Sequence, residues 1–378
     1  MAVYKLFPSQ DTTLYSLYPT MNTGIDEIIE IKNVRGIDGT PDITRGIIKF
    51  DPTDISDIFN DRIGNSNFNV SLKAFISYAQ GINLESTLEV YPLAQNWENG
   101  TGKYLDSPLT TNGASWNSPS YSGSGQVWIE SGSSGGNYFT SSYNSSYSNQ
   151  GGGSWYYSGS GVNNFLVTQS FTLRSEKDLD IDVTTIVDKW NSGSLPNNGF
   201  LIKWTGSIEY NINSSVQPIM KFYSIDTNTI YPPYLELKWD DYSTVLTGSL
   251  SSSIVDTTSL KISLNENPGV FYEESINRFR INVSPLYPAR TYRTSSIFSD
   301  TNYLPTESYW AIKDLDTNEY VINFDTTYTK ISSDTNGNYF DVYMNGLEPE
   351  RYYEILLKTN INGSTIILKD DFYFKVIN

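Results

Sequence analysis

Three aspartates at alternating positions are the first residues of this chain whose spacing could support chemistry. Asp178, Asp180 and Asp182 lie two residues apart, so in a β-strand their side chains would point to one face of the sheet. Three like charges on one face repel one another, which favours either full solvation or a hard cation such as Ca²⁺. Asp182 also fits the simpler role of capping a short helix. The sequence therefore leaves two interpretations, a candidate metal site and a solvated strand.

A second group of carboxylates suggests hydrolysis. Glu98 and Asp106 follow Trp97, and a glycosidase needs only two carboxylates, with an aromatic ring as a platform for the sugar. Carboxylate pairs also arise by chance in a chain with 42 acidic residues. We therefore interpret Trp97 and Glu98 as structural, and we predict no catalytic residue and no cofactor.

The composition excludes most other catalytic chemistry. The chain has 378 residues, no histidine and no cysteine. Without histidine there is no Ser-His-Asp or Cys-His relay and no imidazole ligand for a metal. Without cysteine there is no thiol nucleophile and no disulfide. The net charge of −17 argues against a nucleic-acid partner, which requires a basic face.

Aromatic residues give the candidates for ligand contact. Most of the 8 tryptophans are expected to lie in the core, because tryptophan in an alternating strand usually points inward. Trp128 and Trp155 lie in or beside a stretch dominated by Ser, Gly and Tyr, at 118–161. We interpret that stretch as a long inserted loop, too poor in apolar residues to bury a core of its own. Trp128 and Trp155, together with Tyr156, are therefore the predicted exposed ligand contacts.

Short apolar runs separated by turn residues predict an all-β fold. The chain lacks long helical periodicity, and two short segments at 52–63 and 182–191 are predicted to form helical turns. Thr53 or Asp54 is the expected N-cap of the first segment. The candidate strands are 28–34, 45–50, 68–76, 84–91, 200–204, 219–223 and 234–239 in the first part of the chain, and 261–264, 277–284, 309–314, 320–324, 338–344, 352–359, 365–369 and 371–377 in the last part.

These runs favour two domains. Residues 1–241 are predicted to form a jelly-roll-like β-sandwich that carries the insertion at 118–161. A linker rich in Ser and Thr follows at 242–259, and residues 260–378 are predicted to form a smaller Ig-like β-sandwich.

The first domain resembles the disaggregatase-related family known as DNRLRE. The residues that carry the resemblance stand in the family's order: LEVYPL at 88–93, NWENGT at 96–101, GASWN at 113–117, LDIDVT at 179–184, NGFLIK at 198–203 and PPYLEL at 232–237. The resemblance implies a jelly-roll-like sandwich of the kind found on surface, secreted and some virion proteins. The whole chain is also similar to virion structural proteins of marine myophages.

Composition and resemblance together predict a structural protein of a tailed-phage particle. It would lie in the neck, tail or baseplate and act through contacts with other virion proteins and with copies of itself. One alternative is a receptor-binding adhesin that recognises a host surface glycan, and a second is a polysaccharide hydrolase that uses carboxylates. The N-terminus does not have the pattern of a signal peptide, and no run of about 20 apolar residues predicts a membrane span.

Overall fold

The chain folds into two compact units. A computed structural model describes residues 2–35, 41–82, 85–129, 131–134, 137–141, 151–158, 164–209, 217–246, 253–265, 267–287 and 301–378. The larger unit comprises Leu6–Gly64 and Asn69–Glu236, and the smaller unit comprises Met1–Lys5, Asn65–Phe68 and Leu237–Asn378. The predicted domain boundaries, by comparison, put residues 1–5 and 65–68 in the first domain.

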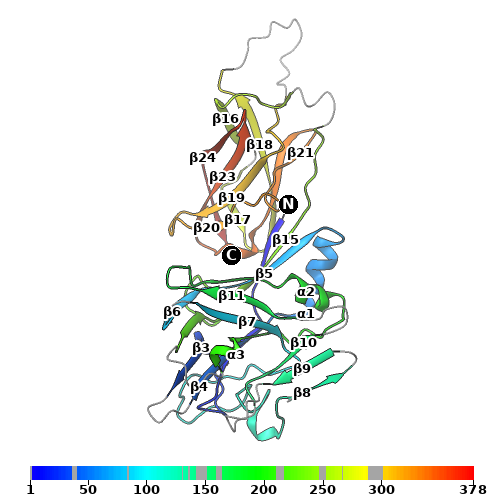
Figure 1. Ribbon diagram of the computed structural model, residues 1–378. Helices are drawn as coiled ribbons and strands as arrows, with labels where there is room; N and C mark the ends of the chain where they lie inside the picture. The colour runs from blue at the N-terminus through cyan, green and yellow to red at the C-terminus, as the bar shows by residue number, and fades with distance from the viewer. Residues whose placement is uncertain are drawn as a thin grey trace, which may run out of the picture. The chain divides into compact units, whose positions relative to one another are not determined.

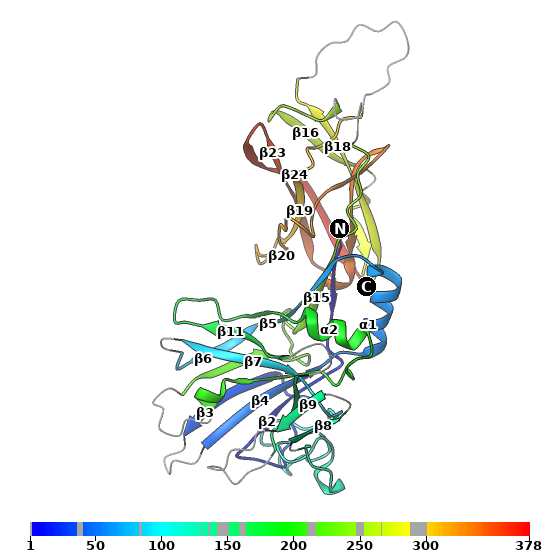
Figure 2. The ribbon, with the colours of Figure 1, turned by 45° about the vertical axis from the view of Figure 1, so that its right-hand side comes forward.

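The larger unit is built on a wide antiparallel sheet (Figure 1 and Figure 2). That sheet has the order β11-β7-β13-β4-β3-β14-β6, with β2 also paired to β4. A second sheet has the order β1-β15-β5-β12, and its residues are divided between the two units, since Met1–Lys5 and Leu237–Asn378 belong to the smaller one. The strands are β1 (Ala2–Leu6), β2 (Gln10–Tyr15), β3 (Ile28–Arg35), β4 (Pro41–Lys49), β5 (Phe68–Ala74), β6 (Ile76–Gln80), β7 (Ser86–Pro92), β11 (Val167–Phe171), β12 (Leu179–Asp182), β13 (Phe200–Trp204), β14 (Ile219–Tyr223) and β15 (Tyr234–Trp239).

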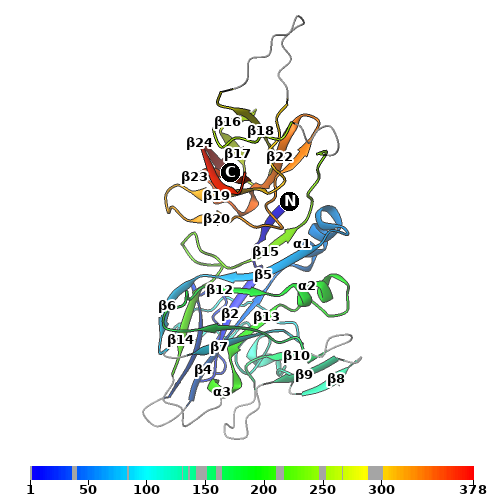
Figure 3. The ribbon, with the colours of Figure 1, turned by 45° about the horizontal axis from the view of Figure 1, so that its top comes forward.

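Strand β5 alternates between buried and partly buried side chains, whereas β13 is buried along its whole length. In β5, Val70, Leu72 and Ala74 are buried, whereas the residues between them are only partly buried. This period of two is what a sheet requires when one face packs on a core and the other meets water. Figure 3 shows β5 and β12 next to each other, with β7 below them. The predicted all-β sandwich class is confirmed.

The smaller unit is a sandwich of two sheets. One sheet has the order β16-β18-β22-β21 and the other has the order β17-β24-β23-β19-β20. Their strands are β16 (Leu260–Asn265), β17 (Val270–Tyr272), β18 (Ile276–Pro285), β19 (Ser308–Asp314), β20 (Tyr320–Ile322), β21 (Ser332–Asp334), β22 (Gly337–Tyr343), β23 (Tyr352–Ile361) and β24 (Ser364–Ile377). The predicted strands at 365–369 and 371–377 are one strand, β24, with an irregular register against β23.

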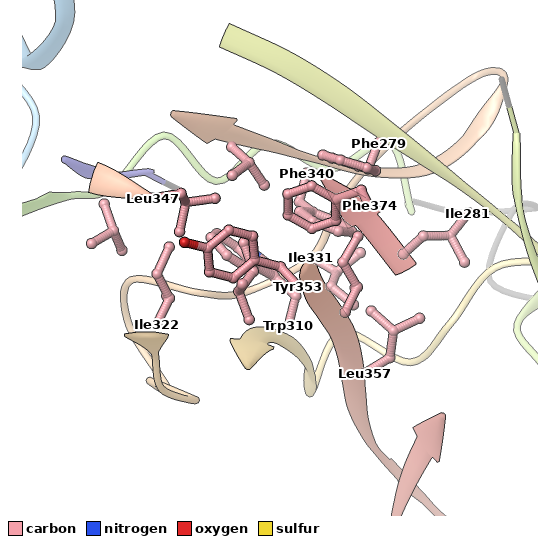
Figure 4. Close-up of a cluster of buried hydrophobic side chains, with 14 of the residues drawn as sticks. Phe279, Ile281, Trp310, Ile322, Ile331, Phe340, Leu347, Tyr353, Leu357 and Phe374 are labelled. Atoms are coloured by element: carbon pink, nitrogen blue, oxygen red, sulfur yellow. The ribbon is translucent and has the colours of Figure 1, made fainter. Parts of the chain in front are cut away.

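Stacked aromatic rings fill the core of the smaller unit (Figure 4). The Phe340 ring lies between Phe279, at a centroid distance of 5.4 Å, and Trp310, at 4.9 Å, and both pairs are stacked. Phe374 from the opposite sheet meets Phe279 at 5.7 Å. Rings at these distances add to the free energy that their burial already contributes. Val255, which lies in the predicted linker, packs into the same core.

Two short helical segments occur where the sequence predicts them. The first is α1 (Pro52–Ile58), continued by a single π-turn, η1 (Phe59–Ile63). Its N-cap is Asp51, whose carboxylate accepts a hydrogen bond from the Thr53 amide at 2.8 Å, so the predicted cap was wrong by two or three residues. The second is α2 (Thr184–Asn191), and its buried residues are Ile186, Val187 and Trp190. Within the described residues, no helix is long and apolar enough to cross a membrane.

The Ser/Gly/Tyr-rich stretch contains regular structure, which the loop interpretation did not predict. Its described residues form a short 3-10 turn, η2 (Ser122–Ser124), and a three-stranded antiparallel sheet of the order β10-β9-β8. The strands are β8 (Ser131–Ser134), β9 (Asn137–Ser141) and β10 (Ser154–Ser158). Figure 3 shows the three strands side by side. Backbone hydrogen bonds hold such a sheet, so small side chains do not prevent it.

Candidate functional site

The predicted ligand-contact tryptophans are buried, so the expectation that they are exposed was wrong. Trp128 is 2% exposed and Trp155 is 5% exposed, and both belong to an apolar cluster with Leu14, Leu93 and Leu201. The Trp128 indole donates a hydrogen bond to the Ser115 carbonyl at 2.9 Å. These side chains anchor the insertion to the larger unit. Their rings therefore cannot form a platform for a ligand.

Tyr156, the third predicted contact, is partly buried. It follows Trp155 in β10, so its side chain points to the opposite side of the strand. Burial raises the pKa of its phenol. Tyr156 keeps part of its surface in contact with solvent.

A buried cluster of charges lies beneath the insertion. Arg45 of β4 forms two hydrogen bonds with Glu209 at the end of α3 (Gly206–Glu209), at 2.8 and 2.9 Å. Lys203 of β13 lies 2.7 Å from a carboxylate oxygen of Glu89 and 3.5 Å from one of Glu209. The paired geometry supplies the Coulomb attraction and hydrogen bonds that offset the desolvation of these charges. We therefore interpret the cluster as structural.

Arg45 also connects this cluster to the insertion. Its third hydrogen bond goes to the Gly152 carbonyl at 2.8 Å. The guanidinium lies 5.1 Å from the ring centre of Trp116 and 5.4 Å from that of Trp155, within the range of cation–π attraction. Gly152 in turn donates its amide to the Trp116 carbonyl at 2.6 Å. Arg45 is thus the residue around which the start of β10 is fixed.

Two of the segments that carry the family resemblance, NWENGT and GASWN, pack around one amide side chain, that of Asn22. The Asn22 amide nitrogen donates to the carbonyls of Asn99 and Ala114, at 2.7 and 2.9 Å, and its oxygen accepts from the Gly102 amide at 2.9 Å. A Cβ atom on Gly100 would lie 2.3 Å from that oxygen, so only glycine fits there. The NWENGT and GASWN segments are therefore explained by close backbone packing.

The three alternating aspartates face solvent and are engaged separately. Asp178 accepts from the Ile76 amide at 2.8 Å, and Asp180 pairs with Lys73 at 2.5 Å. Asp182 accepts from the Thr184 amide at 2.9 Å beside the start of α2, but the N-cap of that helix is Val183, so the capping role expected for Asp182 was wrong by one residue. In the part of the chain that the structure describes, no three acidic side chains converge in a way that could hold a metal ion. Strand β12 is at the edge of its sheet, where charged side chains discourage pairing with another strand.

The carboxylates weighed for hydrolysis have local structural surroundings. The Asp106 carboxylate accepts hydrogen bonds from the Lys103 amide at 2.7 Å and from the Thr110 hydroxyl at 3.2 Å, closing a turn. Glu98 is exposed, and its backbone bonds to Pro119 and Ala114. Trp97 is buried and donates to the Asn198 carbonyl. The ring beside these carboxylates is therefore part of the core.

An open pocket on the wide sheet was not predicted from the sequence. It has a volume of about 460 Å³ and is lined by Glu30, Lys32, Val34, Asp42, Tyr78, Gln80, Ile219 and Lys221. The lining residues come from β3, β4, β6 and β14, which are neighbouring strands. In the sequence, Glu30, Lys32 and Val34 occupy alternate positions of one strand. This alternation indicates a sheet face that is not fully apolar, and it was the local signal for a polar surface at this place.

A line of alternating charges crosses this pocket. Lys221 lies 3.0 Å from Glu30, Lys32 lies 3.4 Å from Glu30, and Lys32 lies 2.8 Å from Asp42. Burial alone would lower the pKa of Lys32, but the hydrogen bond with Asp42 and the charge of Glu30 outweigh burial and raise it. The raised pKa favours the protonated form of Lys32, which lies between the carboxylates of Glu30 and Asp42.

Comparisons with known proteins give no family for this chain. No family model matches it, and no curated protein matches it. The apo structure of β-glucuronidase 3 from Bacteroides uniformis aligns with 100% of this chain and 35% of its own, at 8% identity and a TM-score of 0.17. A β-glucuronidase from Parabacteroides merdae aligns with 96% of this chain and 36% of its own, at 9% identity and a TM-score of 0.14. The chain spans about a third of the length of these enzymes, and TM-scores this low carry no argument about fold or activity.

Proposed function

We propose that the chain is a structural component of a tailed-phage particle, in the neck, tail or baseplate, and not an enzyme. The proposal rests on the resemblance described above and on one structural observation. That observation is the cluster of Arg45, Glu209, Lys203 and Glu89, in which buried charges pair with one another. Groups used in this way hold a rigid scaffold together and are not available to a substrate.

The mechanism that we propose is assembly through fixed surfaces. Sandwich units present sheet faces and loops in a constant geometry, which suits repeated contacts in a symmetric particle. The partners would be other virion proteins and further copies of this chain. The acidic balance of the chain, with a net charge of −17, favours basic partner surfaces.

Location in the particle tests the proposal directly. Particles of the phage that encodes the chain would be purified on a density gradient, digested and analysed by quantitative mass spectrometry. We expect peptides of this chain at a constant ratio to the tail proteins across the gradient fractions. Gold-labelled antibodies against the recombinant chain would then mark the tail side of intact particles. Recovery of the chain only from the soluble host lysate would contradict the proposal.

An assay for polysaccharide hydrolysis tests the non-enzymatic part. The purified chain would be incubated with envelope polysaccharide of the host, and released reducing ends would be measured. We expect no release above a heat-denatured control. Release that is lost in a Glu98→Gln variant would instead favour the hydrolase alternative.

A further inference from the structure

The open pocket on the wide sheet has a regular arrangement across three strands. In the register of β6, β14 and β3, Tyr78 lies opposite Lys221, and Lys221 lies opposite Glu30. The next row places Gln80 opposite Ile219 and Ile219 opposite Lys32. Side chains at opposite positions of neighbouring strands stand side by side, so the two rows form one continuous surface. Figure 3 shows β6 and β14 next to each other in the larger unit.

The two rows combine an aromatic ring with hydrogen-bonding groups. Tyr78 is 46% exposed, and its hydroxyl donates to the Gln80 side chain at 2.7 Å, which fixes the ring at the border of the pocket. Ile219 adds an apolar patch between Gln80 and Lys32. An exposed ring beside polar groups suits a ligand with one apolar and several hydroxylated faces.

The charges in the pocket favour a ligand without net charge. The line from Lys221 through Glu30 and Lys32 to Asp42 alternates in sign and sums to zero. An ammonium group has three N–H donors, and a carboxylate accepts at both oxygens. A lysine and a carboxylate that pair with each other can therefore still donate and accept further hydrogen bonds. Hydroxyl groups of a ligand can bind to both the lysines and the carboxylates, because a hydroxyl both donates and accepts hydrogen bonds. A polyanion is disfavoured by the net charge of −17 on the chain.

A second aromatic group lies on the other side of Lys32. The Lys32 ammonium is 5.5 Å from the ring centre of Tyr15, and the Tyr15 ring is 5.1 Å from that of Tyr104. The pKa of Tyr104 is raised, mainly by burial. The charges of Lys32, Glu30 and Asp42 also act on it, Lys32 by lowering the pKa and the two carboxylates by raising it. Tyr104 is 42% exposed. Exposed rings thus occur on both sides of the charged line, which suits an elongated ligand.

We propose that this surface binds a neutral oligosaccharide, with Tyr78 as the stacking platform and the line of paired charges as the hydrogen-bonding floor. The site differs from the predicted one at Trp128 and Trp155, which are buried. It adds a recognition activity to the assembly role and does not depend on that role. A pocket of about 460 Å³ lies within the usual range for small-molecule sites, about 300–1,000 Å³.

Binding of the full chain to immobilised glycans tests the proposal. A panel of neutral hexose oligosaccharides would be compared with acidic oligosaccharides, and the strongest ligand would be titrated by calorimetry. We expect binding to at least one neutral oligosaccharide. No binding to any neutral member at millimolar concentration, or binding to acidic members alone, would overturn the proposal.

Two variants with one control locate the site. Tyr78→Ala removes the platform, and Glu30→Gln interrupts the line of charges, so each is expected to weaken binding at least about tenfold, a loss of about 1.4 kcal/mol. Tyr287→Ala removes a tyrosine that is 83% exposed in the smaller unit, and it should leave binding unchanged. Circular dichroism and the thermal midpoint of each variant would confirm that it is folded. Equal affinity of Tyr78→Ala and Tyr287→Ala would exclude this surface as the site.

Discussion

The guanidinium of Arg45 lies 2.8 Å from the carboxylate of Glu209, and neither side chain is reached by solvent. The two residues are far apart in the sequence, on β4 and at the end of α3. A buried pair of this kind offsets a large desolvation cost only while both partners are charged. Removal of one charge should therefore cost far more than the loss of a surface ion pair.

The first prediction concerns the substitution Glu209→Gln. The variant keeps the shape of the side chain but leaves the buried Arg45 charge without its main counter-charge, so we expect destabilisation of about 3–5 kcal/mol. The control is Asp180→Asn, because the side chain of Asp180 pairs with Lys73 on the surface and is 55% exposed. Exposed pairs contribute about 0–1 kcal/mol. Urea unfolding followed by tryptophan fluorescence measures both, and equal shifts in the two variants would contradict the structural role of the Arg45 cluster.

The second prediction separates backbone strain from packing at Gly152. Gly152 and Gly125 have the same positive φ of 76°, but a Cβ atom on Gly152 would lie 2.8 Å from the Trp116 ring, whereas one on Gly125 would have nothing within 4 Å. Gly125→Ala should cost about 1–2 kcal/mol, which is the left-handed penalty alone. Gly152→Ala should cost about 1–3 kcal/mol more, because the added methyl overpacks the ring. The difference between their unfolding free energies measures how firmly the insertion is anchored, and a difference near zero would mean that the Trp116 ring moves freely aside.

Local pattern was sufficient for much of the fold. The strands β13, β14 and β15 were predicted at their observed bounds, because each is a short apolar run bordered by turn residues. The predicted strands 352–359 and 365–369 are joined by Asn362 and Gly363, a pair typical of a two-residue hairpin turn, and both residues have positive φ. Local signals were less reliable for exact positions, since the N-cap of α1 is Asp51 and not the predicted Thr53 or Asp54.

The features that the sequence did not predict depend on contacts between residues that are distant in the sequence. The burial of Trp128 and Trp155 depends on partners such as Leu14 and Leu201, which are distant in the sequence. The strands β8 (SGSS), β9 (NYFTS) and β10 (SWYYS) have only four or five residues each and lie in a stretch rich in Ser and Gly, so no sustained period of two marked them. The pocket residues Tyr78 and Lys221 become neighbours only through the pairing of β6 with β14.

The third prediction concerns acid stability of the smaller unit. Asp314 forms two hydrogen bonds with Arg351, at 2.6 and 2.8 Å. Burial opposes ionisation of Asp314, but these bonds and the amides of Thr317 and Asp316 outweigh burial and lower its pKa. Because the pKa of Asp314 is lower in the folded chain than in the unfolded chain, its ionisation stabilises the fold at pH values above the pKa of the unfolded state. This stabilisation is lost as the pH falls through the pKa of the folded state.

The variant Asp314→Asn tests this pH dependence. It should be less stable than the original chain at pH 7, and the difference should shrink towards the acid end of the titration. Thermal midpoints would be recorded at intervals between pH 7 and pH 2, with circular dichroism as the signal. Asp316→Asn is the control, because the side chain of Asp316 is 64% exposed and lies 3.7 Å from Arg351. A stability difference for Asp314→Asn that does not change with pH would contradict the role of its ionisation.

The last prediction concerns Asp11, which responds to pH in the opposite direction. Asp11 lies in β2 and is buried, and its carboxylate accepts a hydrogen bond from the Ile225 amide at 2.7 Å. Burial raises the pKa of Asp11 to about 7, the Ile225 bond opposes this rise, and the nearby Asp226 and Asp26 add to it. In the unfolded chain the same carboxyl has a pKa of about 3.9.

The sign of the effect follows from proton binding. Between about pH 4 and pH 7 the folded chain binds a proton at Asp11 that the unfolded chain has released, so stability declines as pH rises through this window. Above pH 7 the full penalty of the buried charge remains, up to about 4 kcal/mol. The variant Asp11→Asn is neutral at every pH and can keep the Ile225 hydrogen bond through its amide oxygen.

We therefore expect Asp11→Asn to be more stable than the original chain at pH 8 and to approach it at pH 4. Urea unfolding at pH 4, 6 and 8, followed by tryptophan fluorescence, gives the three comparisons. Asp57→Asn, an exposed substitution in α1, is the control and should show no such trend. If Asp11→Asn is instead less stable than the original chain at pH 8, the buried carboxylate must be compensated by a favourable interaction that outweighs its desolvation, and the proposed cause of the raised pKa is wrong.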